Sequence, residues 1–100
     1  MECKEYAVMF KALSDVKRVC IIQLLTKEKL CGCELLKAFQ ITQPTLSHHM
    51  RILVDCELVL TQKRGKYAYY SINENKIESL KTFFTTVGTG QHACGSCDKF

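Results

Sequence analysis

The chain has 100 residues, of which 47% are hydrophobic, and it carries a formal net charge of +4 at pH 7. This length fits one domain with a small core, and no run of about 18 apolar residues indicates a transmembrane helix. The N-terminus lacks the apolar segment of a signal peptide, so we expect a cytoplasmic protein. The mild positive charge permits nucleic acid binding but does not require it.

The cysteine content is high for a chain of this size. The seven cysteines are Cys3, Cys20, Cys31, Cys33, Cys56, Cys94 and Cys97. An odd count without a secretion signal argues against a disulfide framework and favours reduced thiols that are buried or bind a metal. Cys20 lies on an apolar helix stripe and Cys56 ends a predicted helix, and we expect both of them in the core.

Two helices are predicted before the first closely spaced cysteine pair. Residues 3–12 have helical apolar spacing, and residues 15–26 form a second helix with Ser14 as its N-cap and Asp15 in its first turn. The inward stripe of this second helix is predicted to be Val16, Val19, Cys20, Leu24 and Leu25.

Residues 31–51 predict two short helices joined by a tight turn. Thr42 is a suitable N-cap for the second of these helices, and Pro44 falls in its first turn, where a missing N–H costs nothing. The inward stripe of this helix is Leu46, Met50 and Leu53. A helix-turn-helix of this kind places its second helix in the major groove of DNA.

The outward face of that second helix is polar. We expect it to contact bases or phosphates through Gln43, Thr45, Ser47, His48 and Arg51. Adjacent residues on a helix point about 100° apart, so His48 and His49 are not expected to share a metal ion. We expect one histidine to face DNA and the other to pack.

A β-hairpin is predicted after the helix-turn-helix. Residues 58–62 and 67–72 are strand-like, and the turn at 63–66 contains Gly65, which tolerates a positive φ. Such a hairpin after a recognition helix is a wing that can lie against phosphates. Its basic side chains are Lys63, Arg64 and Lys66.

A last helix is predicted over residues 74–87, with Asn73 or Asn75 as its N-cap. The elements before this helix already supply the apolar residues of a core, so its wide apolar stripe suggests a surface for a second subunit. We therefore expect residues 1–87 to form a DNA-binding and dimerisation domain, and residues 88–100 to form a flexible tail with two cysteines. The stripe is Ile77, Leu80, Phe83, Phe84 and Val87.

Four segments of the chain resemble the ArsR/SmtB family of winged-helix, metal-responsive repressors, and within it the arsenic-responsive branch. The segments are Phe10–Asp15 with Arg18, Leu30–Leu35, Ile41–Met50 and Gly65–Tyr70. The resemblance covers about residues 5–87. It implies a mainly α-helical winged helix-turn-helix with about five helices and a two-stranded wing. It also implies a homodimer, paired through its first and fifth helices, that binds double-stranded operator DNA and is released by an inducer.

The thiol pair has a spacing that restricts its backbone. Residues at i and i+2 of a regular helix point about 200° apart, so both sulfurs can bind one ion only if Cys31 precedes the N-cap and Cys33 begins the helix. A helix N-terminus lowers a thiol pKa, so we expect thiolate near neutral pH. Ion capture is expected to drag this helix and misalign the recognition helix.

The expected inducer is As(III) or Sb(III), because three thiolates give a neutral trigonal complex. The family places a third cysteine three residues after the second, but Leu36 stands there. Cys94 or Cys97 could supply the third sulfur, since the seven residues from Val87 to Cys94 can span about 25 Å. Cys3 is a rival donor.

Other inducers and one other function stay open. Two thiolates suffice for an organoarsenical, and Cd(II) or Pb(II) prefers more sulfur. A thiol-disulfide switch at Cys94 and Cys97 is a hypothesis from another class. No prosthetic group is expected, and no phosphate loop or nucleophile-base signature suggests an enzyme.

Overall fold

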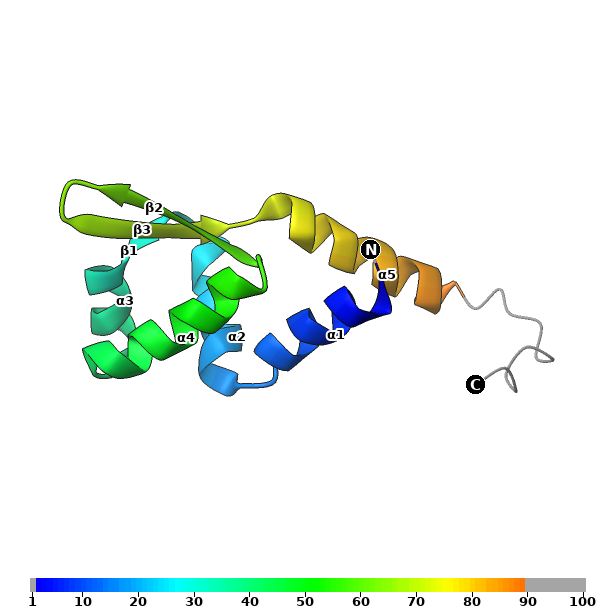
Figure 1. The fold of residues 1–100 in the computed structure, drawn as a ribbon, viewed down its shortest axis with the longest axis horizontal. Coiled ribbons are helices and arrows are strands. Elements are labelled where there is room, and N and C mark those ends of the chain that lie inside the picture. The colour runs from blue at the N-terminus through cyan, green and yellow to red at the C-terminus, as the bar shows by residue number, and fades with distance from the viewer. Residues whose placement is uncertain (1, 90–100) are drawn as a thin grey trace.

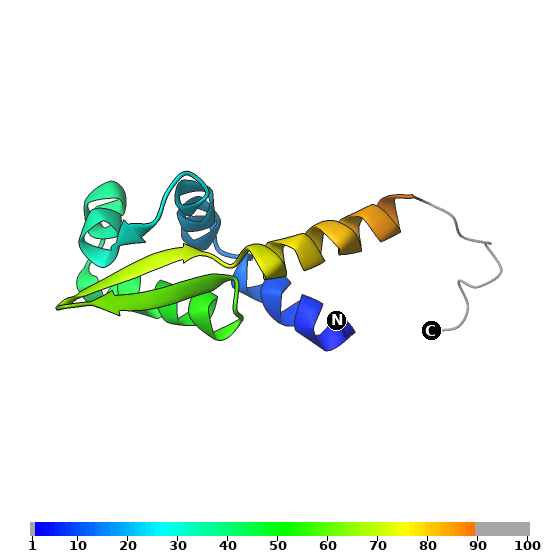
Figure 2. The same cartoon turned by 90° about the horizontal axis from the view of Figure 1, so that it is seen from above.

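The computed structural model describes residues 2–89. Its elements are α1 (Cys3–Ala12), α2 (Val16–Leu25), β1 (Leu30–Cys31), α3 (Gly32–Phe39), α4 (Gln43–Asp55), β2 (Val59–Arg64), β3 (Tyr67–Ile72) and α5 (Glu74–Gly88). Figures 1 and 2 place α1 and α5 at one end of the molecule and α3, α4 and the β2–β3 hairpin at the other. Among these residues, no helix has the length and apolarity needed to cross a membrane.

The sheet has three antiparallel strands in the order β1-β3-β2, whereas the sequence predicted only the two strands of the wing. Strand β3 has the predicted bounds, but β2 runs further than predicted, so Lys63 and Arg64 lie on β2 and only Gly65 and Lys66 form the turn. Gly65 has φ +62°, the left-handed conformation that a tight two-residue turn requires.

The core lies where α2, α3 and α4 meet the sheet. Buried apolar residues from all of these elements form one cluster, and α4 contributes its predicted inward stripe of Leu46, Met50 and Leu53. As predicted, Thr42 caps α4, with its hydroxyl 3.4 Å from the Thr45 backbone N–H that it accepts. The cap and the stripe together fix which face of α4 remains in solvent.

Two predictions about α2 were wrong. Asp15 is the N-cap, because its carboxylate accepts hydrogen bonds from the backbone N–H groups of Lys17 and Arg18, while the Ser14 hydroxyl donates to the Lys11 carbonyl at 2.7 Å. The stripe is also shifted, since Val16 is 79% exposed and Ile21 is fully buried.

The two valines of the predicted α2 stripe, Val16 and Val19, are both exposed. Val16 is the first residue of α2, and its apolar side chain is not buried. Cys20 is half-buried rather than a core residue.

Aromatic rings join α1 to α5. The ring centroids of Tyr6 and Phe83 lie 4.6 Å apart, and Phe10 lies 5.4 Å from Phe83 and 5.7 Å from Phe84. Aromatic pairs at such distances add packing energy beyond their buried area. This cluster holds the last helix of the described chain against the first.

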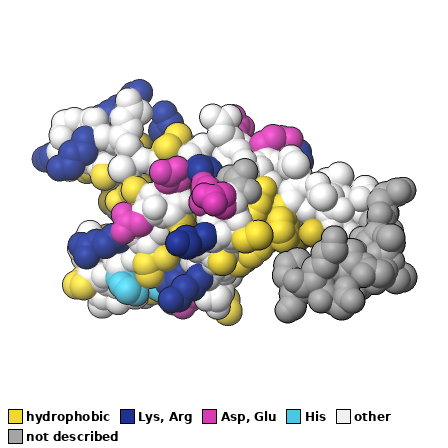
Figure 3. All heavy atoms as spheres, turned by 45° about the vertical axis from the view of Figure 1, so that its right-hand side comes forward, with side chains coloured by type: hydrophobic (Ala, Val, Ile, Leu, Met, Phe, Trp, Pro, Cys, Tyr) yellow, Lys and Arg dark blue, Asp and Glu magenta, His cyan; other side chains and the backbone are white. Residues whose placement is uncertain are grey.

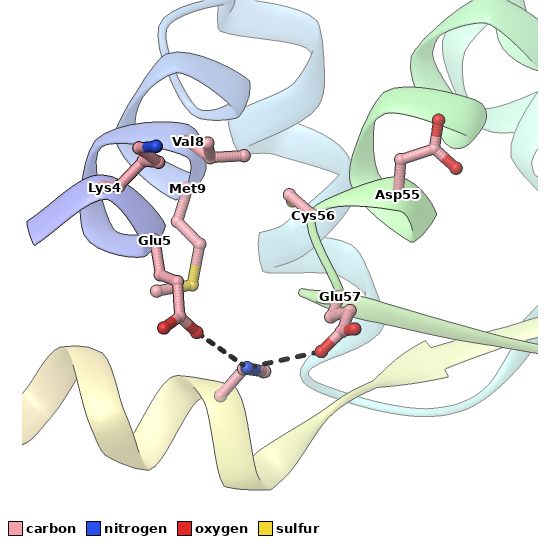
Figure 4. A pocket seen from close by; sticks show the side chains of 8 residues that line it. Lys4, Glu5, Val8, Met9, Asp55, Cys56 and Glu57 are labelled. Carbon is pink, nitrogen blue, oxygen red and sulfur yellow. Dashed lines mark ion pairs between the residues drawn. The ribbon is translucent and has the colours of Figure 1, made fainter. Parts of the chain in front are cut away.

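A cation on α5 ties three elements together. Lys76 Nζ lies 3.8 Å from a Glu5 carboxylate oxygen and 3.3 Å from one of Glu57, and dashed lines in Figure 4 mark both ion pairs. Asn73, one of the two predicted N-caps, is the N-cap of α5, and its side-chain amide donates to the Glu57 carbonyl at 2.9 Å. These contacts fix α5 to α1 and to the α4–β2 connection.

We predict that Ile21→Ala costs about 2–5 kcal/mol of unfolding free energy, because it opens a cavity in a filled core. Val16→Ala, the matched control on the same helix, should change stability by less than about 0.5 kcal/mol. Urea denaturation followed by circular dichroism measures both. Equal losses in the two variants would show that the buried face of α2 has been assigned incorrectly.

Candidate thiol site and nucleic-acid interface

The predicted thiol pair is brought together at the start of α3. Cys31 is the N-cap, with an extended backbone at φ −87° and ψ 164°, and its sulfur lies 2.6 Å from that of Cys33. The prediction that Cys31 precedes the cap was therefore wrong by one position. Its reason holds, because a non-helical backbone at Cys31 allows the two sulfurs to converge. Cys31 is buried and Cys33 is exposed.

Glu34 completes the helix start. Its carboxylate accepts the Cys31 backbone N–H at 2.9 Å, in a reciprocal capping arrangement, and this hydrogen bond lowers the pKa of Glu34. The hydrogen bond with the Cys33 thiol, followed by burial, raises the pKa of Cys31. The expected lowering of the Cys31 pKa was wrong, because the neighbouring thiol and burial outweigh the backbone hydrogen bonds of Glu34 and Cys33, which lower it.

The described chain supplies only two sulfurs to this site. Between residues 2 and 89 no three His, Cys, Asp or Glu side chains form a group that could hold a metal ion. The rival donor Cys3 begins α1, at the end of the molecule away from α3 (Figures 1 and 2). The predicted donors Cys94 and Cys97 lie outside the described residues.

The site is also joined to the wing, which the sequence did not predict. Cys31 lies opposite Tyr69 in the β1–β3 pairing, and Leu30 lies opposite Tyr70. A Cβ on Gly32 would lie 3.9 Å from the Tyr70 ring. Two strand residues carry no periodic signal, so only the pairing with β3 reveals this connection.

The outward face of α4 is polar and open, as predicted. Gln43 donates to the Ser47 hydroxyl at 3.2 Å within this face. The predicted DNA-contacting residues of α4 are all exposed: Gln43, Thr45, Ser47, His48 and Arg51. Side chains of this kind can hydrogen-bond to base edges or phosphates.

The two histidines of α4 diverge as predicted. His48 is exposed, whereas His49 is 8% exposed and its Nδ1 lies 3.1 Å from Arg18 Nη1 on α2. Burial lowers the pKa of His49. The sequence pattern could not predict the contact between Arg18 and His49, because the two residues are 31 positions apart in the chain.

The hairpin presents three basic side chains, Lys63, Arg64 and Lys66, which are all exposed. Figure 3 shows Lys and Arg side chains gathered on the hairpin. Lys66 Nζ also lies 5.9 Å from the centre of the Tyr67 ring. Cations on an extended hairpin next to a polar helix face are suited to contact a nucleic acid backbone.

An apolar face remains uncovered at the other end of the molecule. Phe84 is 58% exposed, and Val8 and Val87 are about half exposed. Figure 3 shows apolar side chains collected over α1 and α5. Phe84 and Val87 belong to the α5 stripe that the sequence predicted for a second subunit, whereas Leu80 of the same stripe is buried in the chain's own core.

Known proteins share this architecture and sequence. A family model described as "Bacterial regulatory protein, arsR family" matches residues 15–61. The arsenical resistance operon repressor of Staphylococcus xylosus is 42% identical over 94 residues, which are 94% of this chain and 90% of the relative. The repressor of the same name from Bacillus subtilis (strain 168) is 37% identical over 78 residues, which are 77% of this chain and 74% of the relative.

Solved structures agree on the fold. A crystal structure of an ArsR family transcriptional regulator has a TM-score of 0.81 at 20% identity, covering 89% of this chain and 92% of the other. A homodimeric winged helix-turn-helix DNA-binding domain from Mycobacterium bovis has a TM-score of 0.71 at 22% identity, covering 90% of this chain and 83% of the other.

The fold is thus that of a DNA-binding regulator and not of an enzyme. With an identity of 42% to an arsenical resistance operon repressor across nearly its whole length, the chain belongs to the ArsR family of winged helix-turn-helix regulators.

Proposed function

We propose that this chain is an arsenite-responsive transcriptional repressor of the cytoplasm. Two copies bind operator DNA through α4 and the basic hairpin. They release it when As(III) or Sb(III) is captured by Cys31 and Cys33, with a third sulfur from Cys94 or Cys97. Relatives named arsenical resistance operon repressors support this proposal.

The observation that carries the proposal is the contact between the two sulfurs at the start of α3. Two neighbouring thiols bind a soft, thiophilic centre far better than one thiol does. Here they sit between the helix-turn-helix and the sheet, so an ion bound to them touches both parts of the DNA-binding unit.

Thiol protonation favours arsenite over a metal dication. A free thiol is mostly protonated at neutral pH. When As(OH)₃ reacts with three thiols, each thiol proton leaves with one hydroxide as water, and the neutral product needs no counterion. Cd(II) has no hydroxide to release, so each thiolate that it binds sends a proton into solvent.

Capture can act on DNA binding along two routes. Cys33 is in the first turn of α3, and α3 is followed by α4 after a short turn. Cys31 is paired to β3, so a displaced β1 also pulls on the hairpin that carries Arg64. A coupling of about 1–3 kcal/mol between inducer and DNA would suffice for release.

The dimer would use the uncovered face of α1 and α5. A second copy laid on this face would cover the exposed Phe84 ring and the exposed valines, and would leave α4 and the hairpin of each copy free. Two recognition helices fixed in this way read two half-sites of one operator.

We predict that Cys31→Ser and Cys33→Ser each bind operator but no longer release it with arsenite. Serine keeps nearly the same size and, at position 31, a capping acceptor, but its oxygen is a poor ligand for a soft centre. Arsenite should lower the affinity of the parent by about 5–150-fold and leave that of either variant unchanged. Fluorescence anisotropy of an operator duplex, selected from a random-sequence pool, measures this.

Cys20→Ser is the matched control, because this thiol is half-buried in α2 and should respond as the parent does. The Cys94→Ser/Cys97→Ser double variant tests the third donor. A response that requires Cys3 and ignores the tail pair would favour Cd(II) or Pb(II) as inducer. Release by peroxide that depends on the tail pair would favour the redox switch.

We predict that pH separates the two classes of inducer. Between about pH 8 and about pH 6, Cd(II) affinity should fall by up to about tenfold per pH unit for each thiol proton displaced, while As(III) affinity changes much less. Near-ultraviolet absorbance of the bonds between sulfur and the bound element measures both affinities. Tighter binding of Cd(II) than of As(III) at neutral pH would contradict the assignment of arsenite.

We predict that Arg64→Ala weakens DNA binding to a similar extent on all sequences and reduces the salt slope by about one unit, because one phosphate contact is lost. Lys81→Ala is the matched control, since Lys81 is an exposed cation on α5 that pairs with Glu78. Anisotropy titrations at several salt concentrations measure the slope. An unchanged slope with altered sequence preference would place Arg64 on bases instead.

A further inference from the structure

One guanidinium connects three helices. Arg18 projects from α2, its Nε donates to the Ala12 carbonyl at 2.6 Å, and its Nη1 lies 3.1 Å from His49 Nδ1. Ala12 is the last residue of α1, and His49 is in the middle of α4. The planar guanidinium of arginine can donate to the Ala12 carbonyl and to His49 Nδ1 at the same time, which a lysine ammonium cannot do with the same geometry.

This contact fixes the protonation of the histidine. A guanidinium has only donors, so Nδ1 of His49 must be the acceptor. The imidazole is then neutral and carries its one proton on Nε2. A second proton would place N–H against N–H and would bring two positive charges together, which breaks the link between α2 and α4.

The charges around His49 act in both directions. Burial lowers its pKa most, and Arg18, His48 and Lys17 lower it further, while the carboxylate of Asp15 raises it. The result is a pKa below the ordinary value of 6.5. The neutral form therefore predominates near neutral pH, and protonation follows as the pH falls below that value.

The inference rests on the proposed function, because it concerns operator binding. We propose that Arg18 is a positioning residue that holds the recognition helix through a neutral His49, so that operator binding weakens when His49 takes up a proton. The α1 end of this link belongs to the helix pair that would form the dimer. Arg18 thereby sets where α4 stands relative to the recognition helix of a second copy.

The experiment measures operator affinity against pH in a background without the outer histidine. His48 is exposed on the α4 face that would meet DNA, so it is removed from both proteins and the comparison is between H48Q and H48Q/H49Q. From about pH 7.5 to about pH 5.5 the affinity of H48Q should fall by at least about fivefold. That of H48Q/H49Q should stay flat, because a glutamine carbonyl accepts from Arg18 at every pH.

Arg18→Lys provides a second variant with the same charge. It should weaken operator binding at about pH 7.5 by about 5–20-fold and should reduce the pH dependence. Sedimentation should show the same dimerisation as for the parent, and circular dichroism should show a folded chain at each pH. A merely structural role would change stability without changing the pH profile.

Three results would overturn the inference. The first is an equal pH profile for H48Q and H48Q/H49Q, and the second is parental affinity and pH dependence for Arg18→Lys. Either of these results, with operator binding intact, would contradict the positioning role of Arg18 and leave the proposed function standing. The third, absence of operator binding by the parent at every pH, removes the proposed function as well.

Discussion

The two sulfurs at the start of α3 lie together because the backbone of Cys31 is extended while that of Cys33 is helical. At an N-cap, an extended residue is followed directly by helical ones without strain. The same extended backbone lets Cys31 pair with Tyr69 on β3. The extended backbone of Cys31 therefore brings the two sulfurs together, begins α3 and joins β1 to the hairpin strand β3.

Helix α4 is held by two kinds of contact. Its apolar stripe packs into the core through Leu46, Met50 and Leu53, which fixes its rotation. Hydrophobic contact is non-directional, so it specifies the position along the helix axis less sharply. The hydrogen bond between Arg18 and His49 adds a directional constraint between α2 and α4.

Local rules accounted for much of the fold. Thr42 and Pro44 mark the start of α4, and Gly65 marks the hairpin turn, because each depends only on its own backbone conformation. The stripe of α2 was misassigned, since spacing alone does not tell which of two apolar faces the core covers.

The rest of the site depended on tertiary contacts. Strand β1 exists only through its pairing with Tyr69 and Tyr70, and the raised pKa of Cys31 depends on its neighbouring thiol and on burial. The Arg18 contact joins residues far apart in the chain. Side-chain types at fixed spacing identified the thiol pair and the polar face of α4, but not what surrounds them.

The unequal burial of the two thiols imposes an order on any reaction at this site. An approaching electrophile meets the exposed Cys33 first, and the buried Cys31 can join only by closing a ring inside the protein. The second bond is then intramolecular and gains the advantage of high effective concentration. A reagent that forms a single bond to sulfur would stop at Cys33, whereas a centre that forms two bonds could bridge both thiols.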